Sequence, residues 1–297
     1  MIISSINYES NQESQVKDYF SLLKPRVMSL VVFTGFAGMF LAPGHINPFI
    51  GLIAILCIAI GSGAAGAINM WYEVDVDAKM ERTKLRPLVT GKINLDEALY
   101  FGVALSSFSV VIMGLAVNIL SAFLLLVAIN FYVFIYTIWL KRRTPLNIVI
   151  GGAAGAFPPM IGWASVTGNL SLTPYILFLI IFMWTPPHFW ALSLYKAKDY
   201  QKANIPMLPV THGEVHTKKQ ILIYSFLMMI VTLIPLFMNA GILYGIASIL
   251  LGIRFIYYAY LVYYDNKYAP KMFGFSIIYL FLIFSFLMID SIYNYSF

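Results

Sequence analysis

From residue 49 to residue 77 the sequence reads FIGLIAILCIAIGSGAAGAINMWYEVDVD. Residues 49–72 carry no charged side chain, and about 20 apolar residues in a helix suffice to cross the hydrocarbon core of a bilayer. Three carboxylates, those of Glu73, Asp75 and Asp77, follow immediately. This stretch predicts a membrane-spanning helix with an acidic site at its end.

The composition extends this interpretation to the whole chain. Hydrophobic residues make up 60% of the 297 residues and charged residues 11%, whereas charged residues make up about 25% of an ordinary soluble domain. Cys57 is the single cysteine, so a disulfide within the chain is excluded. The N-terminal segment has neither the basic stretch nor the cleavage site of a removable signal peptide. We therefore expect one integral membrane domain over residues 1–297.

The apolar stretches give the number of spans. A free backbone N–H finds no partner in the bilayer core, so a spanning segment of this kind is expected to be helical. We predict an all-α membrane protein with nine transmembrane helices, at residues 27–43, 49–72, 98–117, 119–140, 146–165, 174–195, 219–238, 241–264 and 273–292.

Basic residues predict the orientation of the chain. Of the 19 lysines and arginines, one is Arg254, and the other 18 lie before the first stretch or in the links between stretches 2 and 3, 4 and 5, 6 and 7, and 8 and 9. Nine alternating helices place all of these on one side, which the positive-inside rule makes cytoplasmic. The N-terminus is then cytoplasmic and the C-terminus outside. The net charge of +6 is thus spread along a membrane face, which argues against nucleic acid as a partner.

Residues 1–25 form a polar N-terminal segment before the first stretch. Val16, Tyr19 or Phe20, and Leu23 recur at helical spacing within residues 8–25, which suits a short helix at the membrane interface. Residues 1–12 are equally compatible with a disordered tail.

The acidic end of stretch 49–72 has the composition of a metal site. If the helix continues, Asn69, Glu73 and Asp77 share one face, and Asp75 points elsewhere. An amide and two carboxylates offer the oxygen ligands that a hard cation such as Mg²⁺ prefers. Three basic residues that suit phosphate oxygens follow, namely Arg82, Lys84 and Arg86. Alternatively, the carboxylates pair with these neighbouring basic residues and serve only the helix end.

The link 196–218 supplies a second charged cluster. Asp199 lies there beside Lys196 and Lys198. An even number of crossings separates this link from residues 73–97, so both emerge on the same side and the two clusters can meet. Long links of this kind usually carry function.

Stretch 174–195 contains a proline pair followed by a histidine, Pro186-Pro187-His188. The prolines can kink the helix and free backbone carbonyls, which in a bilayer requires other partners for them. An ionisable group facing lipid is costly, so we expect His188 to face the bundle. Two roles remain open: a hydrogen bond to a neighbouring helix, or a contact with a ligand.

These motifs together resemble the UbiA superfamily of intramembrane prenyltransferases. The pattern Asn-x-x-x-(Asp/Glu)-x-x-x-Asp at 69–77, with Asp199 opposite, carries the resemblance. Within the superfamily, residues 23–29, 82–88 and 187–207 resemble the branch that farnesylates haem. Two positions depart from the general pattern: Glu73 replaces an aspartate, and Ala203 stands where many relatives have a second carboxylate. Ala203 argues for the haem branch and leaves the second metal site one ligand short.

The resemblance implies a reaction and a set of site residues. A farnesyl group would pass from farnesyl diphosphate to a vinyl group of haem B (protohaem IX), with addition of water. The resemblance assigns the binding of Mg²⁺ to Asn69, Glu73, Asp77 and Asp199. It assigns the binding of the diphosphate to Arg82, Lys84, Arg86, Lys196 and Lys198. The acceptor would be bound by His188, Trp184, Trp190 and Tyr200. Aromatic rings such as Trp71, Tyr72, Trp184 and Trp190 either stabilise an allylic cation or form interfacial belts and packing contacts.

Two other functions are compatible with parts of the pattern. The first is prenyl transfer to an aromatic quinone or chlorophyll precursor, which a carboxylate at position 203 would have favoured. The second is transport, which calls for deep ionisable groups and internal symmetry. Only Arg254 and His188 lie deep, and no repeat is visible.

We expect the bacterial inner membrane or the mitochondrial inner membrane, with the site on the cytoplasmic or matrix side.

Overall fold

The structure is a computed structural model that describes residues 14–293. Every regular element in this range is helical. The long helices begin and end close to the apolar stretches of the sequence. They are α2 (Pro25–Leu41), α3 (Pro48–Tyr72), α5 (Leu95–Ala116), α6 (Ile119–Asn130) with the π-helix η1 (Phe131–Leu140), α7 (Asn147–Ala156) with α8 (Pro158–Thr167), α9 (Leu172–Tyr195), α12 (Gly213–Leu233) with the 3₁₀-helix η2 (Ile234–Met238), α13 (Ile242–Tyr264) and α14 (Ala269–Tyr293).

Eight helices in the described range are long and apolar enough to cross a membrane. A ninth span results only if α1 (Val16–Leu22) and α2, which meet at 54°, are taken together. The all-helical, multi-pass membrane fold is thus confirmed. The count of nine and the orientation of the termini stay predictions. The interfacial helix expected within residues 8–25 corresponds to α1, and residues 1–12 lie outside the described range.

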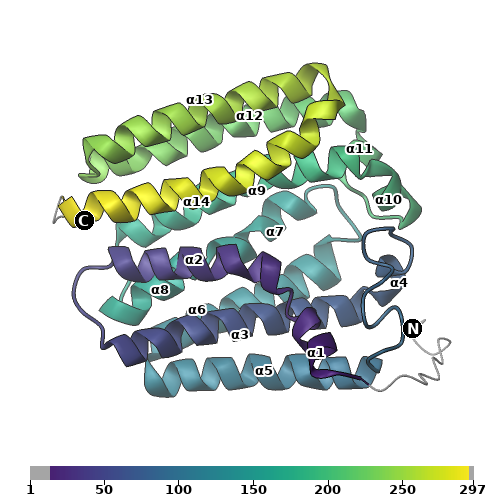
Figure 1. The fold of residues 1–297 in the computed structure, drawn as a ribbon, viewed down its shortest axis with the longest axis horizontal. Helices are drawn as coiled ribbons and strands as arrows, with labels where there is room; N and C mark the ends of the chain where they lie inside the picture. Colours follow the sequence, from purple (N-terminus) through teal and green to yellow (C-terminus); the bar gives the residue numbers. More distant parts are fainter. Residues whose placement is uncertain (1–13, 294–297) are drawn as a thin grey trace.

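The long helices lie side by side and run roughly along the long axis of the molecule (Figure 1). α3 packs on α5, α2 on α8, and α9 on α12. The short helices α4 (Val74–Asp77), α10 (Ala197–Lys202) and α11 (Leu208–Thr211) gather at one end, and α14 ends at the other (Figure 1). The polar connections of the sequence are therefore concentrated at one end of the bundle.

Small residues allow two of these helices to pack with their backbones in contact. A methyl group on Gly162 of α8 would overlap the carbonyl oxygen of Gly35 on α2, and one on Gly38 would overlap Pro159. Close approach of this kind is how helices gain packing energy in lipid, where no hydrophobic effect drives them together. The α2–α8 contact fixes the position of α2, whose first turn reaches the polar end.

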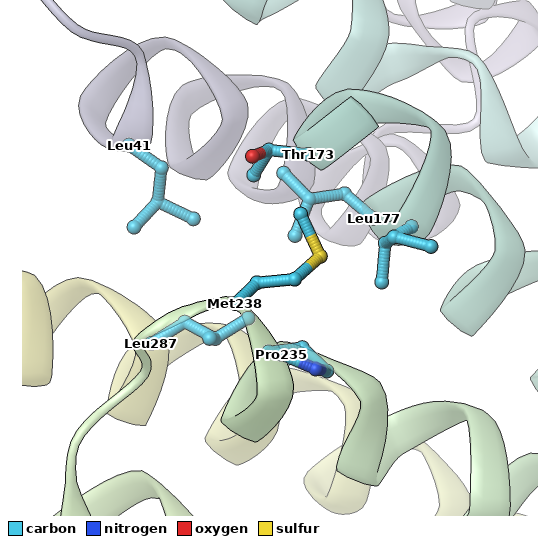
Figure 2. Close-up of a pocket in the computed structure, with 7 residues that line it drawn as sticks. Leu41, Thr173, Leu177, Pro235, Met238 and Leu287 are labelled. Atoms are coloured by element: carbon cyan, nitrogen blue, oxygen red, sulfur yellow. The ribbon is translucent and has the colours of Figure 1, made fainter. Parts of the chain in front are cut away.

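A small cavity lies at the end of the bundle away from the short helices (Figure 2). It has a volume of about 10 Å³, and its lining is almost wholly apolar: Leu41, Thr173, Ile176, Leu177, Pro235, Met238 and Leu287. This is about the space of one water molecule. It can hold neither a prenyl chain nor a macrocycle, and it contains none of the predicted site residues.

Candidate active site

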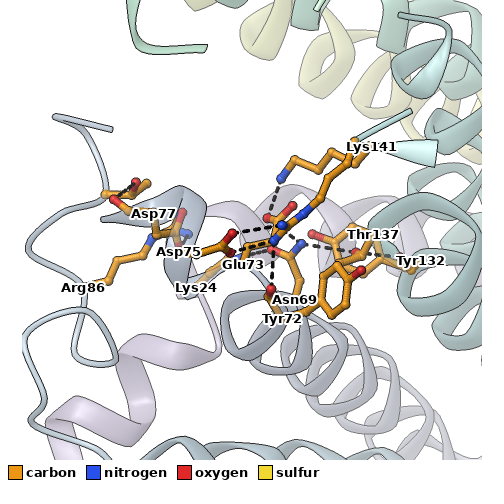
Figure 3. Close-up of polar contacts among 12 residues, drawn as sticks. Lys24, Asn69, Tyr72, Glu73, Asp75, Asp77, Arg86, Tyr132, Thr137 and Lys141 are labelled. Carbon is orange, nitrogen blue, oxygen red and sulfur yellow. Dashed lines mark hydrogen bonds and ion pairs between the residues drawn. The ribbon is translucent and has the colours of Figure 1, made fainter. Parts of the chain in front are cut away.

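The predicted amide–carboxylate pair forms at the end of α3 (Figure 3). Asn69 lies in the last turn of α3, and its Nδ2 donates to Oε2 of Glu73 at 2.9 Å and to Oγ1 of Thr137 at 3.2 Å. Both Asn69 and Glu73 are buried. The four-residue spacing therefore brings these two side chains together as the sequence predicted.

Contrary to the prediction, helix α3 does not continue to Asp77. α3 ends at Tyr72, Glu73 adopts φ −107° and ψ 15°, and α4 begins at Val74. Asp77 is consequently positioned by the loop that follows: its Oδ2 accepts from Nη1 of Arg86 at 2.5 Å, and its carbonyl accepts from Oγ1 of Thr83 at 2.9 Å. Asp77 is thus paired with Arg86, one of the basic residues that follow it in the sequence.

Asp75 faces away from this cluster, as predicted. Its carboxylate is half exposed and accepts two hydrogen bonds from Arg142, at 2.7 and 2.9 Å. Partial burial raises the pKa of Asp75, but the hydrogen bonds and charge of Arg142 outweigh that effect, so the pKa lies below its ordinary value. Asp75 thus anchors α4 to the residues that follow η1.

Two lysines that the sequence did not single out complete the cluster (Figure 3). Nζ of Lys141, the residue after η1, lies 2.5 Å from Oε2 of Glu73. Nζ of Lys24 donates to Oδ1 of Asn69 at 2.9 Å. Lys24 precedes Pro25 and adopts the left-handed conformation (φ 50°), which is costly for a residue with a side chain and is typical of functional sites.

The two buried lysines differ in their electrostatics. Burial, together with the charges of Arg86 and Lys141, lowers the pKa of the Lys24 ammonium group to about 7. Burial also lowers the pKa of Lys141, but the adjacent Glu73 carboxylate more than offsets it and the net shift is upward. The reason is that Lys141 contacts a carboxylate directly, whereas Lys24 contacts a neutral amide.

The second loop contacts the first through apolar side chains. Tyr200, Ala203, Ile205 and Met207 form one buried cluster with Val76 and Met80 and with Ile148. The two long connections therefore meet on one side of the bundle, as the even number of crossings predicted. Ala203, the departure from the superfamily pattern, is buried in this contact.

The charged side chains of the two loops are less closely packed than these apolar side chains. Asp199 is buried in α10, but no hydrogen bond or ion pair joins its side chain to Asn69, Glu73 or Asp77 in residues 14–293. Lys84 is exposed and pairs with Glu81, and Nζ of Lys196 lies 5.8 Å from the centre of the Tyr195 ring. Arg82 and Lys198 are exposed.

The oxygen set is compatible with a hard cation. Oε1 of Glu73 is buried and has no hydrogen-bond partner within the described part of the chain. In that same part, no three side chains among histidines, cysteines, aspartates and glutamates converge on one metal position. Mg²⁺ in proteins is usually held by one or two carboxylates together with water and substrate phosphates, so an incomplete protein shell suits it.

A π-helix borders the cluster. Its ten residues, Phe131–Leu140, include Thr137, whose Oγ1 donates to the carbonyl of Tyr132 five residues earlier at 2.8 Å and accepts from Asn69. The Tyr132 and Tyr136 rings lie 5.4 Å apart. π-Helical segments are rare and frequently occur at functional sites. No sequence pattern distinguishes this segment from an α-helix.

His188 is packed between two aromatic rings from two helices. The Trp184 ring stacks on it at 4.1 Å and the Phe273 ring of α14 at 4.6 Å. Nδ1 of His188 lies 2.6 Å from Oγ of Ser276, and Nε1 of Trp184 donates to the Ser276 carbonyl at 2.8 Å. His188 therefore faces the bundle, as expected. The hydrogen bond to a neighbouring helix is present. The contact with a ligand stays a prediction, because this bond leaves Nε2 available.

Two other predicted features of α9, the proline pair and Trp190, do not take part in the contacts of His188. α9 stays helical through Pro186 and Pro187, so the proline pair does not interrupt it, and Oγ1 of Thr185 donates to the Ile181 carbonyl. Trp190 packs edge-on against Tyr224 of α12. It therefore lies on a different side of α9 from His188, which contacts α14.

Comparison with known proteins agrees with this fold. Residues 31–288 match the model of the UbiA prenyltransferase family. The protoheme IX farnesyltransferase of Rhizobium etli is 59% identical over 285 residues, which cover 94% of this chain and 90% of that protein. The protein of the same name from Rickettsia bellii is 56% identical over 289 residues, with 95% and 96% covered.

Solved structures share the fold at low sequence identity. A structure of digeranylgeranylglyceryl phosphate synthase matches with a TM-score of 0.77 at 20% identity, covering 93% of this chain and 98% of that one. A UbiA homolog from Archaeoglobus fulgidus bound to DMAPP and Mg²⁺ matches with a TM-score of 0.67 at 19% identity, covering 90% and 99%. The chain therefore belongs to the UbiA prenyltransferase family and is an enzyme embedded in the membrane.

Proposed function

We propose that the protein transfers a farnesyl group from farnesyl diphosphate to a vinyl group of haem B, giving haem O and diphosphate. The observation that carries this proposal is the identity of 56–59%, over nearly the whole chain, with relatives named protoheme IX farnesyltransferase. The buried polar cluster at one end of the bundle supports it, because a diphosphate donor requires such a cluster beside an apolar interior.

The diphosphate end of the site is formed by Lys24, Arg86 and Lys141. Lys24 contacts Asn69, Arg86 contacts Asp77 and Lys141 contacts Glu73, so a diphosphate bound there would meet one guanidinium and two amino groups. Asn69, Glu73, Asp77 and Asp199 would hold Mg²⁺, which neutralises charge that develops on the leaving diphosphate. The Archaeoglobus fulgidus homolog holds DMAPP together with Mg²⁺, which supports a metal-dependent reaction.

The basic residues of the loops would complete the diphosphate contact. Arg86 offers a planar fork that matches two phosphate oxygens, whereas lysines act as point charges. Arg82, Lys84, Lys196 and Lys198 lie in the two loops that meet at this end, and their long side chains would reach a bound diphosphate.

The chemistry follows from the donor and the acceptor. The bond between C1 of the farnesyl group and the diphosphate oxygen breaks, and its electron pair leaves with the diphosphate. The vinyl π electrons of haem B then form a bond to C1 of the allylic cation. The new cation beside the pyrrole ring adds water and loses a proton, which leaves a hydroxyl group. The overall reaction consumes one water.

Aromatic rings beside the polar cluster would stabilise the allylic cation. Tyr132 and Tyr136 lie on η1 next to Thr137, which contacts Asn69, and Gly151 lies so close to the Tyr136 ring that any side chain there would displace it. A cation over such a ring is stabilised by about 2 kcal/mol when water is excluded.

The acceptor side would include His188, with Trp184 stacked on it, in the apolar interior below the loops. Tyr200 would lie nearer the surface, in the cluster that joins the loops. An imidazole nitrogen suits the iron of a haem acceptor.

The test is product formation by the purified protein in lipid vesicles. Farnesyl diphosphate and Mg²⁺ are supplied with either haem B or a hydroxybenzoate, and products are identified by mass spectrometry. The proposal predicts a haem product heavier by one farnesyl group and one hydroxyl group, which disappears when EDTA removes the metal. A farnesylated hydroxybenzoate in place of haem O would show that the acceptor has been misassigned.

A further inference from the structure

The contacts of Ser276 bear on which nitrogen of His188 carries the proton. Oγ of Ser276 donates to the carbonyl of Phe273 at 2.6 Å, and the same Oγ lies 2.6 Å from Nδ1 of His188. A hydroxyl group has one hydrogen and can donate it only once. With that hydrogen on the Phe273 carbonyl, Oγ accepts from His188, and the proton is on Nδ1.

The second ring nitrogen has no corresponding partner. Within residues 14–293, no hydrogen bond reaches Nε2 of His188. Both faces of the imidazole are covered, by Trp184 at an interplanar angle of 20° and by Phe273 at 24°. An imidazolium buried inside a bilayer is costly, so the neutral ring is expected. Nε2 then presents a lone pair in a ring that cannot turn freely.

The surrounding contacts fix this arrangement from α14. Nε1 of Trp184 donates to the Ser276 carbonyl at 2.8 Å, so Ser276 contacts both His188 and the ring stacked on it. Phe273 belongs to the preceding turn of the same helix. One turn of α14 therefore sets the plane, the rotation and the tautomer of a side chain on α9.

We propose that Ser276 is a positioning residue, which holds His188 as the Nδ1–H tautomer so that Nε2 ligates the iron of the acceptor haem. The identity of the acceptor rests on the proposed function; the tautomer does not. Histidines that bind metals almost always donate their other N–H to a neighbouring oxygen, which fixes the ring and makes the ligating nitrogen more basic. Ser276 supplies that oxygen here.

The tautomer is tested without any substrate. The protein is labelled with ¹⁵N-histidine, and the His188 signal is identified by its loss in His188→Gln. The one-bond and two-bond ¹H–¹⁵N couplings then show which nitrogen bears the proton. Nδ1–H is expected in the wild type and Nε2–H in Ser276→Ala. A wild-type His188 protonated on Nε2 would overturn the proposal.

The role of the tautomer is tested with haem B. Loss of the second partner of a metal-binding histidine typically weakens metal binding about 10–100-fold. Ser276→Ala is therefore expected to weaken haem binding by about tenfold and to shift the Soret band, with an unchanged KM for farnesyl diphosphate. Ser225→Ala is the matched control, because Ser225 is also buried and, among residues 14–293, its side chain bonds only to a backbone carbonyl, that of Ile221.

The two proposals fail separately. Normal haem O production with unchanged haem affinity and spectrum in Ser276→Ala would contradict the role of Ser276 alone. A wild type that binds haem through His188 but forms no haem O would contradict the proposed function and leave the positioning role intact.

Discussion

Lys141 and Glu73 form a buried ion pair between segments that are far apart in the sequence. Nζ of Lys141 lies 2.5 Å from Oε2 of Glu73, and the two side chains are 17% and 1% exposed. The pair joins the end of η1 to the end of α3 and leaves Oε1 of Glu73 without a partner in the described residues. It places a carboxylate inside the bundle, where a metal–diphosphate complex would need one.

Breaking this pair from one side should destabilise the fold. In Lys141→Met the Glu73 carboxylate stays buried without its cation, which costs about 3–5 kcal/mol. The free energy of unfolding in detergent measures the loss. The double variant Glu73→Gln/Lys141→Met removes both charges and should recover most of the stability while remaining inactive. An equally unstable double variant would show that the loss is one of packing.

Two neighbouring aspartates should differ sharply in their effect on turnover. Asp77 is buried and belongs to the polar cluster, whereas Asp75 is half exposed and paired with Arg142. Asp77→Asn should lower kcat at least about 100-fold, because it removes a charge that acts on the metal–diphosphate complex. Asp75→Asn should stay within about threefold of the wild type. Equal losses of kcat would refute this division of roles.

The planar shape of the Arg86 guanidinium group should contribute to diphosphate binding in addition to its positive charge. Arg86→Lys keeps the positive charge but cannot contact two phosphate oxygens at once. The loss of one charged hydrogen bond corresponds to about a tenfold increase in KM for farnesyl diphosphate. Arg142→Lys makes the same change at the neighbouring pair with Asp75 and should leave that KM unaltered. An unchanged KM in Arg86→Lys would mean that Arg86 serves only Asp77.

The α2–α8 contact should be sensitive to a single methyl group. Gly162→Ala would overlap the backbone of Gly35, and overpacking of this kind costs about 1–3 kcal/mol. Gly155→Ala, in the adjoining helix α7, meets no atom within 4 Å and should be neutral or slightly stabilising. Thermal unfolding in detergent compares the two. A stable Gly162→Ala would show that α2 and α8 can move apart freely.

The polar end should be reachable only from the cytoplasm. Cys57 is buried and should not react with a thiol reagent, so the labelling measures the introduced cysteine. Lys84→Cys should react with a membrane-impermeant thiol reagent only in inverted vesicles, and Asn169→Cys, at the opposite end, only in intact cells. Labelling of Lys84→Cys from outside would reverse the predicted orientation.

The helical spans and the Asn69–Glu73 contact were predictable from the sequence, for a physical reason. An apolar run of sufficient length has few alternatives in a bilayer, so stretches such as 49–72 became helices with nearly the same bounds. The Asn69–Glu73 contact depends only on helical spacing, which a sequence displays directly.

The rest depends on tertiary contacts. The break at Glu73 and the return of the loop to bring Arg86 onto Asp77 were not visible in a pattern of helical spacing. Lys24 and Lys141 became site residues only because α2 and η1 pack beside α3. Ser276 lies in an ordinary apolar helix, and nothing in its neighbours indicates that it contacts a histidine of α9.

The most direct test of the account is a pigment extract. Cells that lack their own haem farnesyltransferase are given the wild-type protein or Asp77→Asn, and their extracted haems are compared with a haem O standard by chromatography and mass spectrometry. The account predicts haem O with the wild type and haem B alone with Asp77→Asn at equal protein levels in the membrane. Absence of haem O with the wild-type protein present in the membrane, or equal amounts with both, would contradict it.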